Sequence, residues 1–209
     1  WREEPAKTSA QEFTLQTIEV NPTVALPIGD KLAMAIGLRI VHSKGIVISN
    51  GTAEVLPATY RVVSRDMKGN SIDFGYNLAL AYKPTSEIEL GLTYRSKIDL
   101  SVEGSAKLSE SLTSTTYGGG TSVSVPLPSA LNFAAAYTFA SKTTVEFVYE
   151  RTFWSEYKEL DFNYSGTLSA VLTGVFDSTV AKNWKDVSAY RLGITQEIDE
   201  LTLMCGIVI

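Results

Sequence analysis

The sequence of 209 residues predicts an all-β fold: a transmembrane antiparallel β-barrel, built as an up-and-down meander, of which about eight strands are present. Three observations predict it. Bulky apolar residues alternate with small or polar ones, short connections alternate with long ones, and no run of about 18 apolar residues could form a transmembrane helix. A mean hydropathy of only +0.05 fits strands that present a single face to lipid.

The clearest alternation runs from Ile72 to Asp99 and predicts two strands joined by a tight turn. One face carries bulky residues: Ile72, Phe74, Tyr76, Leu78, Leu80, Tyr82, Ile88, Leu90, Leu92 and Tyr94. The other carries small or charged residues: Asp73, Gly75, Asn77, Ala79, Ala81, Glu89, Gly91, Thr93, Arg95, Lys97 and Asp99. A soluble sheet has no need for rows of Gly and Ala opposite a bulky face, whereas a barrel turns bulky residues to lipid and small or polar ones to its lumen.

The other expected strands cover residues 13–26, 32–48, 123–139, 143–154, 187–196 and 201–209. Pro22 interrupts the first of these, which implies an edge or a bulge. Short turns are expected at 27–31, 83–87, 140–142 and 197–200, and long connections near 49–70, 105–121 and 155–186. Within the last connection, residues 168–176 are apolar enough for a short helix or a buried loop.

Residues 1–209 are therefore expected to form a single β-barrel segment whose long connections are extracellular, because outer-membrane barrels have short periplasmic turns and long outer loops. Aromatic residues near the strand ends are expected to form a girdle at the lipid interface: Tyr82, Tyr94, Tyr137, Tyr149, Phe153, Trp154 and Tyr190. No signal peptide is visible, and the sequence stops at Ile209 inside an apolar alternation, so a fragment of a longer barrel is expected.

Composition argues against several other classes. A net charge of −5 disfavours nucleic-acid binding, which requires clustered Lys and Arg. One His, His42, and one Cys, Cys205, provide no metal cluster, no Cys–His pair and no internal disulfide. No cofactor and no enzymatic activity are therefore expected, and His42 is interpreted as a surface residue.

Seven short motifs occur in an order that resembles one family. They are Asn21-Pro22-Thr23-Val24-Ala25, Phe74-Gly75-Tyr76-Asn77, Leu92-Thr93-Tyr94-Arg95-Ser96-Lys97 with Gly104, Leu127-Pro128, Trp154-Ser155, Asn183-Trp184-Lys185-Asp186 and Arg191-Leu192-Gly193. Over most of the chain the sequence resembles the FadL/TodX family of outer-membrane transporters for long-chain fatty acids and other hydrophobic compounds. The resemblance implies a barrel of about fourteen strands with an N-terminal hatch, and this sequence lacks the hatch and the terminal strands.

The resemblance also implies a passive route. A hydrophobic ligand settles between the extracellular loops, its carboxylate meets basic groups, and it leaves sideways through the barrel wall into the membrane. The positions nearest the family's basic site residues are Lys44, where Ser49 is the aligned residue, and Lys182.

Further candidate ligand-binding residues come from the faces of the strands. Arg39 and Arg95 fall on the predicted lumen face, where they either pair with lumen carboxylates or hold a ligand carboxylate. A set of apolar residues either lines a hydrophobic groove or packs as a loop: Leu168, Val171, Leu172, Val175 and Phe176.

The expected location is the bacterial outer membrane, and the expected state is a monomer. The expected partners are a fatty acid or other hydrophobic small molecule, together with outer-membrane lipid and lipopolysaccharide. Two other functions stay open: an outer-membrane barrel with an adhesive or structural role, and a soluble β-protein that binds a lipid in its interior.

Overall fold

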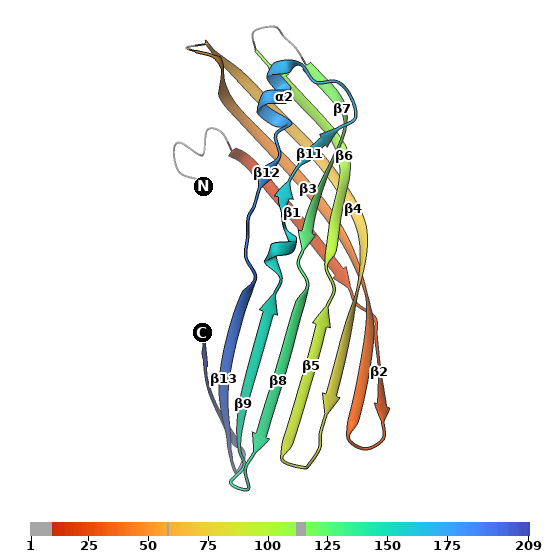
Figure 1. Cartoon of the computed structure of the whole chain (residues 1–209), viewed down its shortest axis with the longest axis vertical. Helices are drawn as coiled ribbons and strands as arrows, with labels where there is room; N and C mark the ends of the chain where they lie inside the picture. The colour runs from red at the N-terminus through yellow and green to blue at the C-terminus, as the bar shows by residue number, and fades with distance from the viewer. Residues whose placement is uncertain (1–9, 58, 112–115) are drawn as a thin grey trace.

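The computed structural model describes residues 10–57, 59–111 and 116–209, which form one tall, curved antiparallel sheet and a small two-stranded one (Figure 1). Residues 1–9, 58 and 112–115 lie outside the described residues, and so does part of the connection expected near 105–121. No helix in the described ranges is long and apolar enough to cross a membrane.

The main sheet has two tiers, which share two very long strands. The lower tier has the order β2 (Thr23–Ile28), β3 (Leu32–Leu56), β4 (Thr59–Tyr82), β5 (Ile88–Arg95), β8 (Ala130–Thr138), β9 (Thr143–Thr152), β13 (Val187–Ile198) and β14 (Leu201–Val208). The upper tier has the order β1 (Ala10–Val20), β3, β4, β6 (Ile98–Glu110), β7 (Thr116–Leu127) and β11 (Phe162–Tyr164).

Three strands of the meander are broken where they pass from one tier to the other. The breaks fall at residues 21–22 between β1 and β2, at 96–97 between β5 and β6, and at 128–129 between β7 and β8. Pro22 and Pro128 lack the N–H that a strand ladder requires, which explains two of the breaks. If each broken strand is counted once, the described residues form the expected meander of about eight strands.

The long connections expected near 49–70 and 105–121 are mostly strand, and this part of the expectation was wrong. β3 and β4 stay paired from Leu32 opposite Tyr82 up to Leu56 opposite Thr59. The ladder of β6 and β7 likewise includes Ser105 opposite Gly120. These segments are rich in Ser, Thr, Gly and Asn, so their sequence shows little hydropathy contrast, but backbone pairing satisfies their N–H and C=O groups all the same.

The connection expected near 155–186 is irregular for most of its length. It contains the short helix η1 (Trp154–Glu156), the paired strands β10 (Glu159–Leu160) and β12 (Val180–Ala181), and β11 of the upper tier. Residues 168–176 take the helical alternative as α2 (Ala170–Phe176), which begins after Ser169, whose hydroxyl accepts a hydrogen bond from the Leu172 N–H at 3.3 Å.

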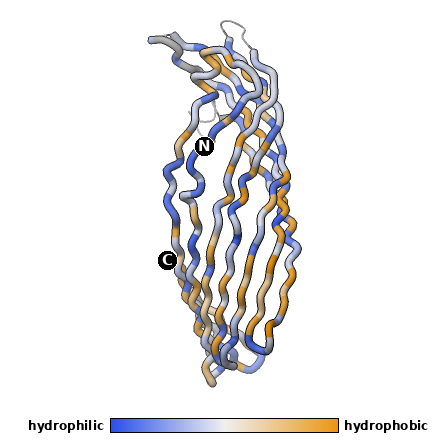
Figure 2. Tube along the Cα trace, turned by 45° about the vertical axis from the view of Figure 1, so that its right-hand side comes forward, coloured by the Kyte–Doolittle hydropathy of each residue, from blue (hydrophilic) through white to orange (hydrophobic). Residues whose placement is uncertain are grey.

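The bulky face of the lower tier points outward, as the alternation predicts. Phe74 is 63% exposed, Leu92 41% and Phe133 39%. Figure 2 shows hydrophobic and hydrophilic residues alternating along these strands. The outward row from Ile72 to Tyr82 is about as long as the 9–11 residues that a tilted strand needs to cross a bilayer.

Aromatic rings line this outward face. The ring centroids of Tyr149 and Tyr190 are 5.3 Å apart, and those of Tyr137 and Phe139, near the short turns, are 4.7 Å apart. Their positions near the strand ends fit the expected interfacial girdle.

The inward face is hollow below and packed above. Near the short turns, small residues such as Ala33, Gly91 and Ala134 line a hollow of about 510 Å³. In the middle, the inward residues of β6 cover β3, and this cluster consists of Val41, Ile98, Leu100 and Val102. Higher up, α2 covers a second cluster, which consists of Val63, Met67, Ala106, Leu108, Leu172 and Phe176.

Candidate functional site

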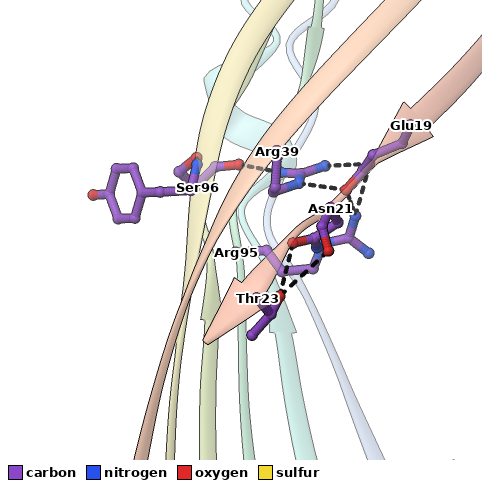
Figure 3. A network of polar contacts seen from close by, with 7 residues as sticks. Glu19, Asn21, Thr23, Arg39, Arg95 and Ser96 are labelled. Atoms are coloured by element: carbon purple, nitrogen blue, oxygen red, sulfur yellow. Dashed lines mark hydrogen bonds and ion pairs between the residues drawn. The ribbon is translucent and has the colours of Figure 1, made fainter. Parts of the chain in front are cut away.

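Three charged side chains from three different strands meet at the junction of the two tiers. Glu19 of β1 accepts hydrogen bonds from Arg39 of β3, with Nε–Oε1 at 2.9 Å and Nη2–Oε2 at 3.0 Å. Arg95, at the end of β5, donates from Nη2 to the same two oxygens at 3.1 and 3.0 Å (Figure 3). The structure thus brings the two predicted arginines together on one carboxylate, which we call the Glu19 cluster.

Arg39 has a second contact that fixes the backbone. Its Nη1 donates to the carbonyl of Ser96 at 2.7 Å, at the break between β5 and β6. Ser96 is also bonded to Tyr76, since its N–H donates to the Tyr76 carbonyl at 2.9 Å and its hydroxyl accepts from the Tyr76 N–H at 2.9 Å. The Arg39 side chain is only 4% exposed, so these contacts hold it in a fixed position.

Arg95 is the more available of the two cations, with a side chain 50% exposed. Two guanidinium groups share one carboxylate, because Glu19 is the single carboxylate among the described residues that forms a salt bridge with either arginine. The cluster therefore keeps one net positive charge, and Arg95 has N–H donors left for a second anion.

A further cation lies in the upper tier, beneath α2. Arg65 of β4 lies opposite Ser49 in the ladder and donates from Nε to the Ser49 hydroxyl at 3.3 Å. Its guanidinium carbon lies 5.2 Å from the ring centre of Phe162 and 5.5 Å from that of Phe176. No carboxylate in the described part of the chain forms a salt bridge with Arg65, so this charge is held by aromatic rings and a hydroxyl.

Tyr164 packs against the apolar cluster beneath α2, and we call this cluster together with Arg65 the compartment beneath α2. Its hydroxyl donates to the carbonyl of Phe176 at 3.3 Å, and its ring packs edge-on against Tyr117 with 5.7 Å between the centroids. Burial raises the pKa of Tyr164, and the positive charge of Arg65 opposes part of this rise. The compartment is therefore mostly apolar, with the Arg65 guanidinium at its edge and the Asp177 carboxylate near Tyr164.

The five apolar residues proposed from the sequence divide between the core and the edge of this compartment. Leu172 and Phe176 are buried in the cluster with Met67, Ala106 and Leu108. Leu168 and Val175 pack against the cluster and are partly buried, and Val171 is also partly buried. α2 thus covers this part of the strands with its buried side chains.

The two predicted lysines lie elsewhere. Lys44 is exposed on the outward face of β3, next to Gln16 of β1 and Asn70 of β4 in the ladder. Lys182 lies above the ring of Tyr157, with Nζ 5.7 Å from the ring centre. Neither lysine joins the Glu19 cluster or Arg65.

Two of the sequence motifs, Trp154-Ser155 and Asn183-Trp184-Lys185-Asp186, meet above β9 and β13. The Trp154 and Trp184 rings pack edge-on at 5.2 Å between centroids. Asp186 accepts from the Ser155 N–H at 3.0 Å and from Arg151 Nη2 at 3.1 Å. Hydrogen bonds from Ser155, and more weakly Arg151, hold the pKa of Asp186 below its usual value. These motifs therefore fasten the two ends of the long connection to each other.

Sequence reasoning missed Glu19 and Arg65. Glu19 lies in a strand whose alternation was recognised, but only the register between β1 and β3 brings it to Arg39. Arg65 falls in the segment 49–70, which was expected to be a loop. The signal available for Arg65 was the alternation of Val63, Arg65 and Met67 with the polar residues Ser64 and Asp66. Across the described ranges, no group of three His, Cys, Asp or Glu residues could hold a metal ion.

Residues 2–208 match the family described as outer membrane protein transport protein (OMPP1/FadL/TodX). A 47 kDa outer membrane protein of Pasteurella multocida is 28% identical over 166 residues, which is 73% of this chain and 36% of that protein. Outer membrane protein P1 of Haemophilus influenzae is 23% identical over 219 residues, 92% of this chain and 46% of that protein. The chain thus spans less than half the length of the curated relatives it matches.

Solved structures share the fold. A FadL homologue from Pseudomonas aeruginosa has a TM-score of 0.79 at 16% identity, over 94% of this chain and 50% of that one. The toluene transporter TbuX of Ralstonia pickettii has a TM-score of 0.70 at 19% identity, over 94% and 56%. The predicted β-barrel class is thereby confirmed. The chain belongs to the OMPP1/FadL/TodX family of outer-membrane transport proteins, a class of channels and transporters rather than enzymes, and its location is the bacterial outer membrane.

Proposed function

We propose that the protein carries hydrophobic molecules with a carboxylate group, long-chain fatty acids in particular, passively across the outer membrane. Arg65 is the observation that carries the proposal. An arginine without a salt bridge to any described carboxylate lies near two phenyl rings, at the edge of an apolar cluster. Such a site suits a molecule that has one anionic end and a hydrocarbon body, because the charge and the chain each find a matching surface.

The proposed route runs from this compartment down the inside of the sheet. Arg65 pairs with Ser49 and Arg39 with Gly75 in the β3–β4 ladder, so the upper and lower cations are about ten residues apart, or roughly 33 Å. The half-exposed Arg95 offers a second position for the carboxylate. Between them lies the apolar cluster around Val41 and Leu100, which would have to part for the ligand to pass. Exit is proposed to be sideways through the barrel wall, without an energy source.

The proposal is tested by uptake in bacterial cells that lack their own fatty-acid importer and carry the full-length gene. We expect the wild-type gene to restore uptake of labelled oleate. We expect Arg65→Ala to weaken oleate binding about 10-fold or more relative to wild type, since a hydrogen bond to a charged group contributes about 1.5–3 kcal/mol. Arg65→Lys should keep part of the binding because it keeps the charge. Lys158→Ala, an exposed loop change, is the matched control.

Uptake of toluene in the same cells separates two ligand classes, because toluene has no carboxylate. If Arg65→Ala reduced toluene and oleate uptake equally, the carboxylate site would be wrong and a monoaromatic ligand, as the name of TbuX gives for that protein, would be the better proposal. If the wild-type gene restored neither uptake, the transport proposal would fall and an adhesive or structural role would take its place.

A further inference from the structure

The outward face of the sheet carries a basic hollow above its apolar band. Lys44 of β3 lies opposite Asn70 of β4, His42 is two residues below Lys44, and Lys68 is two residues above Asn70. These side chains are exposed, and with Ser105 of β6 they border an open hollow of about 590 Å³. We call these five residues the Lys44 patch.

The Lys44 patch lies at the edge of the lipid-facing surface. Ile40 opposite Phe74 is the highest pair of the β3–β4 ladder in which both outward residues are bulky and apolar, and His42 opposite Ile72 follows it. The short turns lie at the other end of these strands, and outer-membrane barrels turn their short turns to the periplasm. The patch is therefore level with the headgroups of the outer leaflet.

The charges of the patch are poorly compensated. Lys44 and Lys68 are diagonal neighbours, with about 7–8 Å between such positions on one face of a sheet. Within the described ranges no carboxylate forms a salt bridge with Lys44, and Lys68 has only the partly exposed Asp66, with Nζ–Oδ1 at 4.0 Å. So long a pair between partly exposed side chains contributes little, so two nearby cations remain without a strong counter-charge.

The nearest further carboxylate is that of Glu103. Glu103 of β6 lies opposite Asn70 on the side of β4 away from Lys44, and it is a diagonal neighbour of Lys68. Among the described contacts it forms no salt bridge with Lys44 or Lys68. Lys44 and Lys68 border one hollow, and the apolar outward face of the strands lies below it. This arrangement is complementary to an anion that carries acyl chains.

We propose that the Lys44 patch binds a phosphate of lipopolysaccharide, the phosphorylated glycolipid of the outer leaflet. Lys44 and Lys68 bind the phosphate oxygens, and compact ammonium groups suit this task. Asn70 and Ser105 offer donors and acceptors for the sugar hydroxyls beside the phosphate. The acyl chains lie below, against the apolar outward face. This site faces away from the lumen and is independent of the transported ligand.

The proposal is tested with the intact protein, purified in mild detergent, by titration with bisphosphorylated lipid A and native mass spectrometry. We expect Lys44→Ala/Lys68→Ala to bind lipid A about 10- to 30-fold more weakly than wild type, because each lysine contributes to attraction by an anionic lipid. Lys44→Arg/Lys68→Arg should bind like wild type. The matched control is Lys158→Ala/Lys185→Ala, which removes the same charge from exposed loop positions and should change nothing.

Two further ligands test whether the patch recognises the phosphate groups of lipid A. The wild-type protein should bind dephosphorylated lipid A and phosphatidylglycerol much more weakly than bisphosphorylated lipid A. Equal binding of lipid A by wild type and the double alanine variant, or loss of binding in the double arginine variant, would overturn the site. Equal binding of phosphatidylglycerol would overturn the assignment to lipopolysaccharide.

Discussion

The guanidinium of Arg39 donates to the backbone carbonyl of Ser96 at 2.7 Å while it is paired with Glu19 on its other edge. A single buried arginine thus ties β1 and β3 to the break between β5 and β6. The break turns β6 over the inward face of β3, where Ile98 and Leu100 are buried. A buried charge is unfavourable unless it is paired and hydrogen-bonded, and both conditions are met here.

We expect Arg39→Ala to destabilise the fold far more than Arg95→Ala. Loss of a partner from a buried ion pair costs about 3–5 kcal/mol, whereas loss of a half-exposed partner costs about 1 kcal/mol or less. The measurement is the urea midpoint of unfolding in lipid vesicles, followed by tryptophan fluorescence. Equal midpoints for the two variants would show that the contact with Ser96 does not support the fold.

The orientation of the strands predicts opposite outcomes for neighbouring positions on β5. Leu92→Lys should strongly impair insertion, because a cation at mid-bilayer on the lipid face costs about 2–4 kcal/mol. Gly91→Ser faces the lumen, where the nearest atom to an added Cβ is the Ala134 Cβ at 3.7 Å, and should be tolerated. Heat-dependent mobility on gels measures the folded fraction, and equal folded fractions would contradict the assignment of faces.

Gly104 of β6 lies where two strands come very close. An added Cβ would collide with the backbone carbonyl of Lys68 and would lie 2.5 Å from the Cα of Gly69. Because backbone atoms cannot move aside as a side chain can, Gly104→Ala should lower stability by about 1–3 kcal/mol. Gly118→Ala on β7, with no atom within 4 Å of the added Cβ, is the control. Unchanged urea midpoints for both variants would argue against this close approach.

The packing of α2 makes a local prediction. Leu172 is a residue of the helix whose side chain is fully buried against the strands, and its replacement by Ala should cost about 2–5 kcal/mol of local packing. We expect faster amide hydrogen exchange over residues 170–176 and weaker oleate binding, while the lower tier keeps its protection. Thr173→Ala, on the exposed side of the same helix, should leave the exchange unchanged. Equal amide exchange rates over residues 170–176 in wild type and Leu172→Ala would mean that the packing of Leu172 does not hold the helix in place.

The faces of the lower strands were predictable because their residues differ so strongly in kind. Phe74 and Leu92 alternate with Gly75 and Gly91, and a period of two leaves one geometric solution. The short turns followed from the same pattern, whereas the break at Pro22 followed from the missing N–H of proline. The helical alternative for residues 168–176 came from their apolar character alone, and the structure adds that Ser169 caps the helix.

The strand character of residues 49–70, the Glu19 cluster and the position of Arg65 could not be predicted from the pattern of one strand alone. Residues 49–70 read as a loop because Ser49, Asn50 and Thr52 have little apolar contrast with their neighbours, although each has a partner across the ladder. The Glu19 cluster required the register of β1 against β3, and Arg65 required both the β4 extension and the folding of α2 onto it. Long-range pairing of this kind is decided by the whole sheet rather than by local pattern.

The continuous pairing of β3 with β4 gives the compartment beneath α2 a stiff floor well outside the bilayer. From Ile40 opposite Phe74 to Ser49 opposite Arg65 the ladder rises by nine residues, roughly 30 Å. On the proposed route, an arriving ligand would meet this paired hairpin and not an unpaired loop. Ordering of a flexible segment costs about 0.5–1.5 kcal/mol for each side chain immobilised, and capture on a rigid hairpin avoids much of that loss.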